Sequence, residues 1–538
     1  MKIKRDLMRT SLLSALAICL SPAAAVGQAT TITSSVGFAN LTLTTANTPD
    51  VHTATTFTLG QWAALFGTGI FAGMPIQNFG NVPLDTRTGT GFSLVNSAFG
   101  HFASTSITTV PSPPGFRNLD VTGLWTPGTY CNVASGGCPV LSPLIRMPFS
   151  FPAQWSIGMN QVGGPGTLIS TSATFTVTTP TEPVIGPSVA TDSVVQPIAR
   201  QLGLAALGTL HERVGDTAAD AACLNAGSTS TPNGPLITKA PPLITKAPPI
   251  QNCQSQAVWG RLFGQQINNH YEALGDPRAS GQVVGIQSGV DLWRGSLIPG
   301  HSDTAGLYFA YGNGNVGVDG LVTNAAFFNV LQHTGSVNLN AYSGGGYWTH
   351  YGPTGWYIDA VLQGTFYQGN TATQFASLPL NGRGFASSLE AGYPIPLPVF
   401  GPRFALEPEA QIIWQRVSFD DADDGFGPVG LGTTSGATGR LGLRGKWTIN
   451  DPAGQVWQPY VLTNVWRDWG GNATTMFGPD PVPLLEQATR LEFAGGLSAR
   501  ILRGLSLYGQ AGYQVAVGGT DGGRRDGVKG DLGVRYAW

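Results

Sequence analysis

Charge is scarce in this sequence, and its scarcity excludes several classes of protein. Asp, Glu, Lys and Arg make up 11% of the 538 residues, whereas soluble domains carry about a quarter. The formal net charge of −2 provides no basic surface, so no nucleic-acid partner is expected. A mean hydropathy of +0.05 also excludes intrinsic disorder, which needs high charge and few apolar residues.

Long apolar runs are missing as well. No stretch of the chain reaches the roughly 18 consecutive apolar residues that a membrane-spanning helix needs. Within lipid, only helices and closed β-barrels satisfy all their backbone hydrogen-bonding groups. If this chain lies in a membrane, it must therefore do so as a barrel.

The first residues have the composition of an export signal. Lys2, Lys4 and Arg5 precede an apolar stretch at 11–20, and Ala23 and Ala25 form an A-x-A cleavage site. This pattern predicts a signal peptide over 1–25 and passage through the secretion translocon. A retained membrane anchor is the alternative, but the apolar stretch is short for a bilayer.

Cysteine is also rare. One of the five cysteines, Cys19, lies in the predicted signal peptide. An even number left in an exported chain predicts two disulfides in preference to a metal site, and a catalytic thiol is not expected. Three pairings are open, and we expect the local one, Cys131 with Cys138 and Cys223 with Cys253.

Residues 26–190 contain no lysine and are rich in Thr, Ser, Gly and Pro. Short strand-like runs alternate there with turns such as 111–115, which predicts an antiparallel β-sandwich. No repeat of the length of a solenoid unit is visible, which argues against a parallel β-helix. Examples of these strand-like runs are 36–43, 54–59, 92–95, 106–110, 152–159 and 168–177.

Residues 191–214 change to a helical period, with Thr191, Asp192 and Ser193 available as caps. Gly203 and its small neighbours make this helix thin, as a confined channel requires, although a surface helix is the ordinary alternative. Residues 215–256 form a linker in which the heptad PLITKAP occurs twice, at 235–241 and 242–248. Repeated prolines predict an extended, semi-rigid spacer.

Residues 257–538 repeat a period of two. In the last segment, 528–538, Val534, Tyr536 and Trp538 share an apolar face, whereas the opposite face is charged or small. Short connections at 352–355, 450–454 and 502–504 alternate with long ones at 316–335, 420–436 and 469–486, as periplasmic turns and extracellular loops do. An even number of strands is typical of an outer-membrane barrel. The twelve predicted strands are 257–268, 280–294, 303–315, 337–350, 354–367, 382–395, 402–418, 437–449, 456–468, 488–501, 504–517 and 527–538.

Residues 191–538 resemble the translocator of a classical autotransporter, of the type V secretion family. The segments that carry the resemblance are GTLHERVGD at 208–216, VWGRLFG at 258–264, GIQSGVDLW at 285–293, TGRLGLR at 438–444 and YAW at 536–538. The resemblance implies a 12-stranded antiparallel β-barrel in outer-membrane lipid, with the helix in its lumen. It also implies insertion by the barrel-assembly machinery, which would read Val534, Tyr536 and Trp538. We expect the helix residues Arg200, Glu212 and Arg213 to pair with lumenal charges.

The resemblance places residues 26–190 at the cell surface as an exported passenger, and the whole chain is then all-β apart from the lumenal helix. This passenger is short and lacks the solenoid repeats common in the family, so no activity carries over to it. The helix also lacks the Asn-Asn pair that some relatives use for self-cleavage. We therefore expect the passenger to stay attached.

The passenger carries little visible chemistry. His52 and His101 are its only histidines, and no G-x-S-x-G motif occurs. We therefore assign no catalytic residue, no cofactor and no metal, although a triad built on Asp50, His52 and a distant serine stays open. The acidic run Asp420, Asp421, Asp423 and Asp424 is expected to be a solvated loop, with calcium binding as its alternative.

The sequence thus predicts an outer-membrane protein of a Gram-negative bacterium that exports and displays its own passenger. A non-enzymatic role in adhesion or surface interaction is expected, with a ligand that the sequence does not identify. The alternatives are a surface-displayed hydrolase, an esterase or a protease, on the same barrel, and a porin-like channel.

Overall fold

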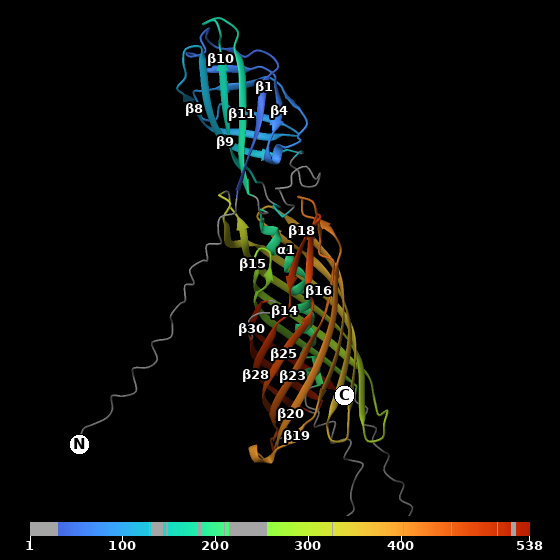
Figure 1. Ribbon diagram of the computed structural model, residues 1–538. Helices are drawn as coiled ribbons and strands as arrows, with labels where there is room; N and C mark the ends of the chain where they lie inside the picture. The colour runs from blue at the N-terminus through green and yellow to red at the C-terminus, as the bar shows by residue number, and fades with distance from the viewer. Residues whose placement is uncertain are drawn as a thin grey trace, which may run out of the picture.

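The computed structural model describes residues 31–128, 130, 144–146, 149–180, 184–208, 210–214, 256–324, 326–401, 403–452, 454–502, 504–517 and 523–538. The predicted signal peptide, the duplicated heptad and the cysteines at 131, 138, 223 and 253 lie outside the described residues. Figure 1 shows an N-terminal β domain, in blue, above a long β-barrel coloured from green to red.

Twelve long strands form the barrel, as predicted, and each pairs antiparallel with its neighbours. The first and last strands close the ring, in a register that runs from Ala257 opposite Ala537 to His270 opposite Arg524. The strands are β12 (Ala257–His270), β14 (Arg278–Gly295), β15 (Ser302–Thr323), β16 (Asn329–Tyr351), β17 (Tyr357–Thr373), β18 (Ser377–Gly392), β20 (Phe404–Phe419), β23 (Thr433–Trp447), β25 (Val456–Gly470), β28 (Thr489–Leu502), β29 (Leu505–Ala516) and β30 (Arg524–Ala537).

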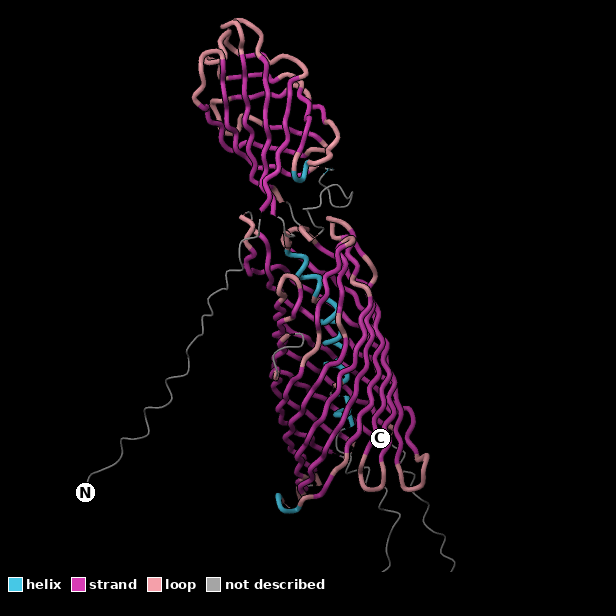
Figure 2. The backbone as a smooth tube through the Cα atoms, viewed as in Figure 1, coloured by secondary structure: helices cyan, strands magenta, loops and turns pink. Residues whose placement is uncertain are grey.

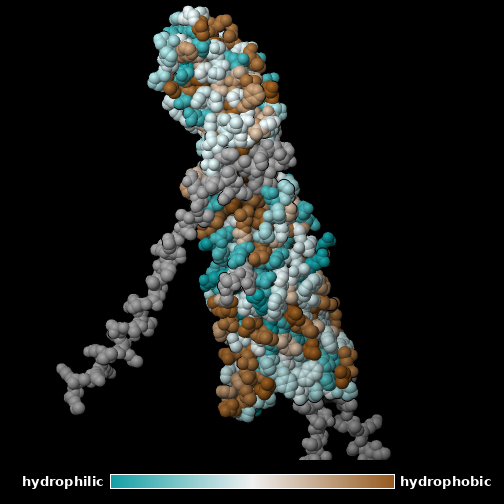
Figure 3. Space-filling view, viewed as in Figure 1, coloured by the Kyte–Doolittle hydropathy of each residue, from teal (hydrophilic) through white to brown (hydrophobic). Residues whose placement is uncertain are grey.

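The two faces of these strands differ as the period of two predicts. In β17, Leu362 and Phe366 are exposed on the outside, whereas Asp359 and Gln363 are buried in the lumen. In the space-filling view, brown apolar side chains gather on the lower part of the barrel (Figure 3). The wall therefore presents apolar side chains outward and polar side chains inward, as a barrel in lipid requires.

The prediction of long loops is wrong in part, because strands make up much of their length. The segment 316–335 continues β15 and β16 as a hairpin whose pairs run from Val316 with Val337 to Thr323 with Asn329. At the same end of the barrel, β13 (Glu272–Ala273), β21 (Ala422–Asp423), β22 (Pro428–Gly430), β26 (Ala473–Phe477) and β27 (Asp480–Leu485) form a five-stranded sheet. Phe477 and Leu484 of that sheet are buried in one apolar cluster with the helix, which explains why these segments are ordered.

Opposite this sheet, the connections are short. They carry β19 (Ile395–Pro396), β24 (Ile449–Asn450) and the 3-10 turn η5 (Pro398–Phe400).

The lumen contains a helical segment in three pieces (Figure 2): α1 (Pro187–Ser193), α2 (Val195–Leu207) and the 3-10 turn η4 (Leu210–Val214). It begins at Pro187, earlier than predicted, since a proline fits the first helical position after Gly186. Residues 191–193 therefore lie inside α1 and do not cap it. No helix among the described residues is long and apolar enough to cross a membrane.

The N-terminal domain consists of two antiparallel sheets that enclose an aromatic core. Trp155 is fully buried there, with its ring 4.5 Å from Phe38 and 5.0 Å from Phe175. In order across the larger sheet, the strands are β5 (Gln77–Phe79), β4 (Trp62–Gly67), β1 (Thr31–Asn40), β11 (Ser170–Pro180), β10 (Phe151–Asn160), β9 (Phe116–Pro127), β8 (Gly100–Val110) and β7 (Ser93–Asn96). The smaller sheet consists of β2 (Thr45–Ala46), β3 (Thr56–Leu59) and β6 (Val82–Asp85).

Two buried contacts join this domain to the upper rim of the barrel. Arg146 Nη1 lies 2.6 Å from Asp424 Oδ1, and both side chains are almost fully buried. Phe327, at the tip of the β15–β16 hairpin, packs its ring 6.1 Å from that of Phe151. Its backbone has a φ of +62°, a conformation that few bulky residues adopt. Asp424 is thus an anchor for the N-terminal domain, which corrects the expectation of a solvated acidic loop at this position.

Candidate functional site: the helix held in the barrel lumen

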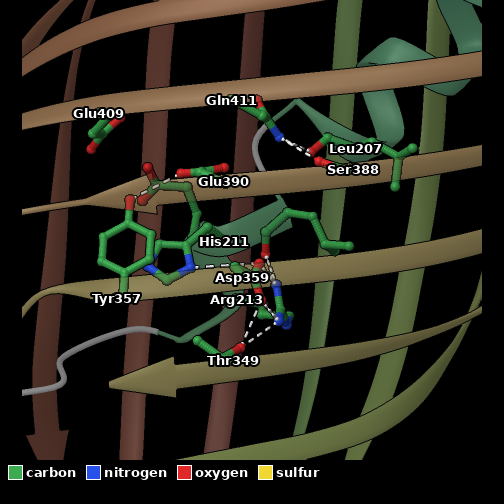
Figure 4. Close-up of polar contacts among 12 residues, drawn as sticks. Leu207, His211, Arg213, Thr349, Tyr357, Asp359, Ser388, Glu390, Glu409 and Gln411 are labelled. Carbon is green, nitrogen blue, oxygen red and sulfur yellow. Dashed lines mark hydrogen bonds and ion pairs between the residues drawn. The ribbon is translucent and has the colours of Figure 1, made fainter. Parts of the chain in front are cut away.

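The lower end of the lumenal segment is fixed by one buried arginine. Arg213 Nη1 and Nη2 donate to the two carboxylate oxygens of Asp359, at 2.9 and 2.7 Å. Arg213 Nη2 also donates to Thr349 Oγ1 at 2.9 Å, and the guanidinium lies 4.1 Å from the ring centre of Tyr347. A bidentate, desolvated pair of this kind sets both position and orientation. Arg213 therefore locks η4 against β16 and β17 (Figure 4).

Two neighbours of Arg213 add further contacts to the wall. The ring of His211 stacks on Tyr357, with centres 3.9 Å apart and planes 5° from parallel. Glu212 faces Arg444, with its carboxylate 3.4 Å from the guanidinium, and accepts a hydrogen bond from Tyr460. Three consecutive residues of the lumenal segment thus contact β16, β17, β23 and β25 of the ring.

Near the upper end, Arg200 holds α2 to the opposite side of the wall. Its Nη1 lies 2.7 Å from Glu486 Oε2, with both side chains about 1% exposed. Gly436 and Gly471 of the wall leave room for this guanidinium, since a Cβ built at Gly436 would lie 2.8 Å from Arg200 Nη2. Glu486 in turn pairs with Arg525 of β30 at 2.8 Å.

Small residues let the helix pass between the inward side chains. A Cβ at Gly203 would collide with Gln415, and one at Gly208 would come within 3.1 Å of Trp466. Cavities of about 30 and 10 Å³ lie beside α2, and each has room for a water or two at most. The thin helix therefore packs closely against the wall in this part of the lumen, as far as the described residues extend.

The structure thus gives each predicted charge of the helix, Arg200, Glu212 and Arg213, a partner in the wall. The alternation of charged residues along the strands indicates which wall residues face inward. It does not indicate which of them meet the helix, because that depends on the shear of the barrel and on the depth of the helix. Asp359, Arg444 and Glu486 were therefore not identified from the sequence.

The residues proposed as an assembly motif lie on the other side of the wall. Val534, Tyr536 and Trp538 are 42%, 49% and 56% exposed on the outer face of β30. The rings of Tyr536 and Trp538 are stacked, with centres 6.1 Å apart. Together they form an apolar strip beside the seam with β12, on the face turned away from the lumen.

The barrel that surrounds the helix matches one known protein family. The family model of the autotransporter β-domain matches residues 258–512. The chain belongs to the classical, type V autotransporters. The barrel of this autotransporter accordingly lies in the outer membrane of a Gram-negative bacterium. The helical segment, which we name the connector, follows the N-terminal domain in the chain, here named the passenger, and precedes the β-domain.

Relatives of the autotransporter match about half of the chain or less. Pertactin of Bordetella bronchiseptica is 28% identical over 282 residues, which are 50% of this chain and 27% of pertactin. The BrkA autotransporter of Bordetella pertussis is 29% identical over 272 residues, 48% of this chain and 24% of BrkA. The adhesin BmaC autotransporter of Brucella suis is 26% identical over 216 residues, 38% of this chain and 6% of BmaC. The matches thus span about a quarter or less of these relatives.

Solved structures that match the chain include translocator domains of other autotransporters. The β domain of Bordetella BrkA is 22% identical with a TM-score of 0.40, and the match covers 53% of this chain and 100% of that one. The transport unit of AIDA-I from Escherichia coli is 19% identical with a TM-score of 0.44, over 54% and 92% of the two chains.

Among the described residues, the rings of His52 and His101 bond to a carbonyl and a hydroxyl and not to an acidic side chain. His52 Nε2 contacts the carbonyl oxygen of Pro113 at 2.9 Å, whereas Asp50 accepts from the backbone amide of His52 and not from its ring. His101 Nε2 lies 3.2 Å from Ser93 Oγ on an exposed strand face. Nearby, hydrogen bonding from Arg87 lowers the pKa of Asp85 to about 2, which keeps that carboxylate ionised.

Proposed function

We propose that this autotransporter exports its own passenger and displays it at the cell surface as a binding module. The course of the connector is the observation that carries the proposal. It leaves the passenger at 184, descends through the lumen, and ends at Val214 near the barrel end where β12 begins. A chain laid out in this way has its passenger on one side of the membrane and the start of its barrel on the other.

The passenger also stays attached on this proposal. The Arg146–Asp424 ion pair is desolvated on both sides, and truncation of one partner of such a pair costs about 3–5 kcal/mol. Thr323 N donates to Ile185 O, and Ile185 N donates to Thr323 Oγ1, both at 2.9 Å, which continues this junction into the barrel. A passenger destined for release has no need of such contacts.

The contacts within the passenger favour display without catalysis. Its buried interior is an aromatic core, and its histidines bind loop carbonyls or an exposed serine. A surface esterase or protease needs a nucleophile, a base and an orienting acid in mutual contact. A porin needs a path for solutes, which the Arg213-locked connector obstructs.

The signal peptide directs the chain to the secretion translocon on this proposal, and the strip of Val534, Tyr536 and Trp538 directs it to the barrel-assembly machinery. Outer-membrane strands are recognised while their lipid-facing residues are exposed, and β30 presents these side chains outward next to the seam. Both partners follow from the route that the proposal requires.

Protease shaving of intact cells tests the proposal. We expect loss of residues 31–180 from the cell surface, with 257–538 protected and its gel mobility still shifted by heat. The control is the same digestion after permeabilisation, which must leave the barrel folded. A passenger that is protected until permeabilisation lies in the periplasm, and the proposal is then wrong.

The enzymatic alternative is tested on the same cells. Ser93→Ala and His101→Ala variants should match the parent in any turnover of ester or peptide substrates. A selective loss of hydrolysis in both variants establishes the surface hydrolase instead.

A further inference from the structure

The far end of the passenger, opposite the barrel, is built from three loops, 41–49, 111–115 and 161–169, which we name the distal tip. β1, β8 and β10 run toward this end, and β9 and β11 run back from it. In Figure 1 the distal tip is the upper end of the passenger, furthest from the barrel.

Hydrogen bonds between the three loops make the distal tip a single preformed surface. Thr44 N donates to Ile169 O at 3.1 Å, and Gly166 N donates to Pro49 O at 2.7 Å. Gln161 is 3% exposed, and its Nε2 donates to Pro49 O and to Thr167 O. The backbone N–H of Gln161 donates to Gly115 O at 2.8 Å, which ties in the third loop.

Large aliphatic side chains project from this rigid surface into solvent. Leu41 and Leu43 are 55% and 50% exposed, and Val162 and Leu168 are 75% and 71% exposed. Brown side chains also gather at the upper end of the passenger in Figure 3. Because the loops are held by hydrogen bonds, these side chains cannot turn inward without breaking the surface that carries them.

The composition of the distal tip favours lipid over protein as its partner. None of the residues of the three loops is charged, and none is Trp, Tyr or Arg. Those three residue types dominate the energetic centres of protein–protein interfaces. A bilayer instead rejects charge and accepts aliphatic side chains. The hydroxyl of Thr167 donates to Val162 O at 3.0 Å and to Gly164 O at 2.8 Å, so this polar group is already satisfied within the distal tip.

We propose that the distal tip inserts Leu41, Leu43, Val162 and Leu168 into the surface of a lipid bilayer outside the cell. This inference rests on the proposed function, since only a displayed passenger turns the distal tip away from the cell. The membrane of the cell itself lies at the opposite pole of the passenger. Attachment to a second membrane therefore bridges two lipid surfaces through one chain.

Vesicle sedimentation with the full chain in nanodiscs tests this inference. The probe is a sucrose-loaded vesicle of zwitterionic phosphatidylcholine, because the distal tip has no charge to prefer anionic lipid. We expect the full chain to sediment with the vesicles equally at low and high salt. A Val162→Ser, Leu168→Ser double variant should lose about tenfold or more of its partitioning.

The matched control replaces exposed apolar residues elsewhere on the passenger. A Phe66→Ser, Val95→Ser double variant changes side chains that are 85% and 73% exposed, but lie outside the distal tip. It should sediment as the parent does. Heat-shifted mobility and the protease fragments of the passenger establish that each variant is folded.

Three outcomes overturn the inference. One is equal sedimentation of both double variants, and another is binding that salt abolishes. The third is pelleting without vesicles that Val162→Ser, Leu168→Ser removes, which would identify a second copy of the chain as the occupant. Both faces of a nanodisc are open to the vesicles, so lipid binding is measured even if cell shaving places the passenger in the periplasm.

Discussion

Removing Arg213 should open the barrel lumen. The Arg213→Met variant keeps much of the side-chain volume but leaves Asp359 buried without its bidentate partner. Both side chains of this pair are at most 3% exposed, and the loss of one partner of such a pair costs about 3–5 kcal/mol. When the connector moves away, water reaches Asp359 and removes this cost. The Arg213→Met substitution therefore favours the state in which the connector is displaced from the wall.

The size of the effect follows directly. About 3–5 kcal/mol corresponds to roughly a 150- to 5,000-fold rise in the ratio of displaced to seated connector. This factor multiplies whatever ratio the remaining contacts set. Single-channel recording of the full chain in planar bilayers should therefore show open events that are rare in the parent and frequent in Arg213→Met.

Two further variants separate this explanation from general damage. Arg213→Met combined with Asp359→Leu removes the unpaired charge, so its openings should fall back toward the parent. Arg535→Met breaks a comparable pair with Asp291, 2.8 Å apart, that joins two barrel strands. It should lower the thermal stability of the barrel without a matching rise in openings. Equal open probability in Arg213→Met and the parent refutes the reasoning.

Three other predictions test other parts of the chain. Gly436→Ala should displace Arg200 from Glu486 and destabilise the heat-resistant barrel by about 3 kcal/mol in a melting assay. The control Gly364→Ala has no atom within 4 Å of the new Cβ and should be near neutral in the same assay. Phe327→Ala removes a side chain that is 6% exposed and should weaken the docking of the passenger on the barrel by roughly 3 kcal/mol. Limited proteolysis should then cut the chain faster between 180 and 187. An unchanged cleavage rate contradicts the docking. Trp538→Ala should reduce the fraction of heat-shifted barrel in outer membranes, while Trp469→Ala, which is 51% exposed on another strand, should leave it nearly unchanged.

The barrel was predictable because its signal repeats. Each lipid-facing strand alternates apolar and polar residues, so twelve weak patterns reinforce one another. The prediction failed where the same alternation continued beyond the expected membrane boundary, as at Val316 and Val318, which are buried by the helix and not by lipid. A period of two does not distinguish these two kinds of burial.

The connector was predictable as a helix but not in its start or its contacts. Thr191 and Asp192 have the chemistry of caps, yet they bond to Thr334 and Thr371 of the wall, at 3.0 and 2.6 Å. Ser193 donates instead to Val189 O of its own helix. Tertiary hydrogen bonds thus replaced the local capping that sequence reasoning assumed. In the passenger, β9 was not predicted, because charged Arg117 and Asp120 interrupt its apolar alternation.

The seam between β12 and β30 fixes an order of events. Every strand of the ring is synthesised after the connector, and no enclosed lumen exists until β30 pairs with β12. The helix that fills this lumen is therefore synthesised before the lumen is closed. On the proposed route, the barrel strands assemble around a helix of the same chain. The pairing of β30 with β12 then determines when a closed pore is available to the passenger.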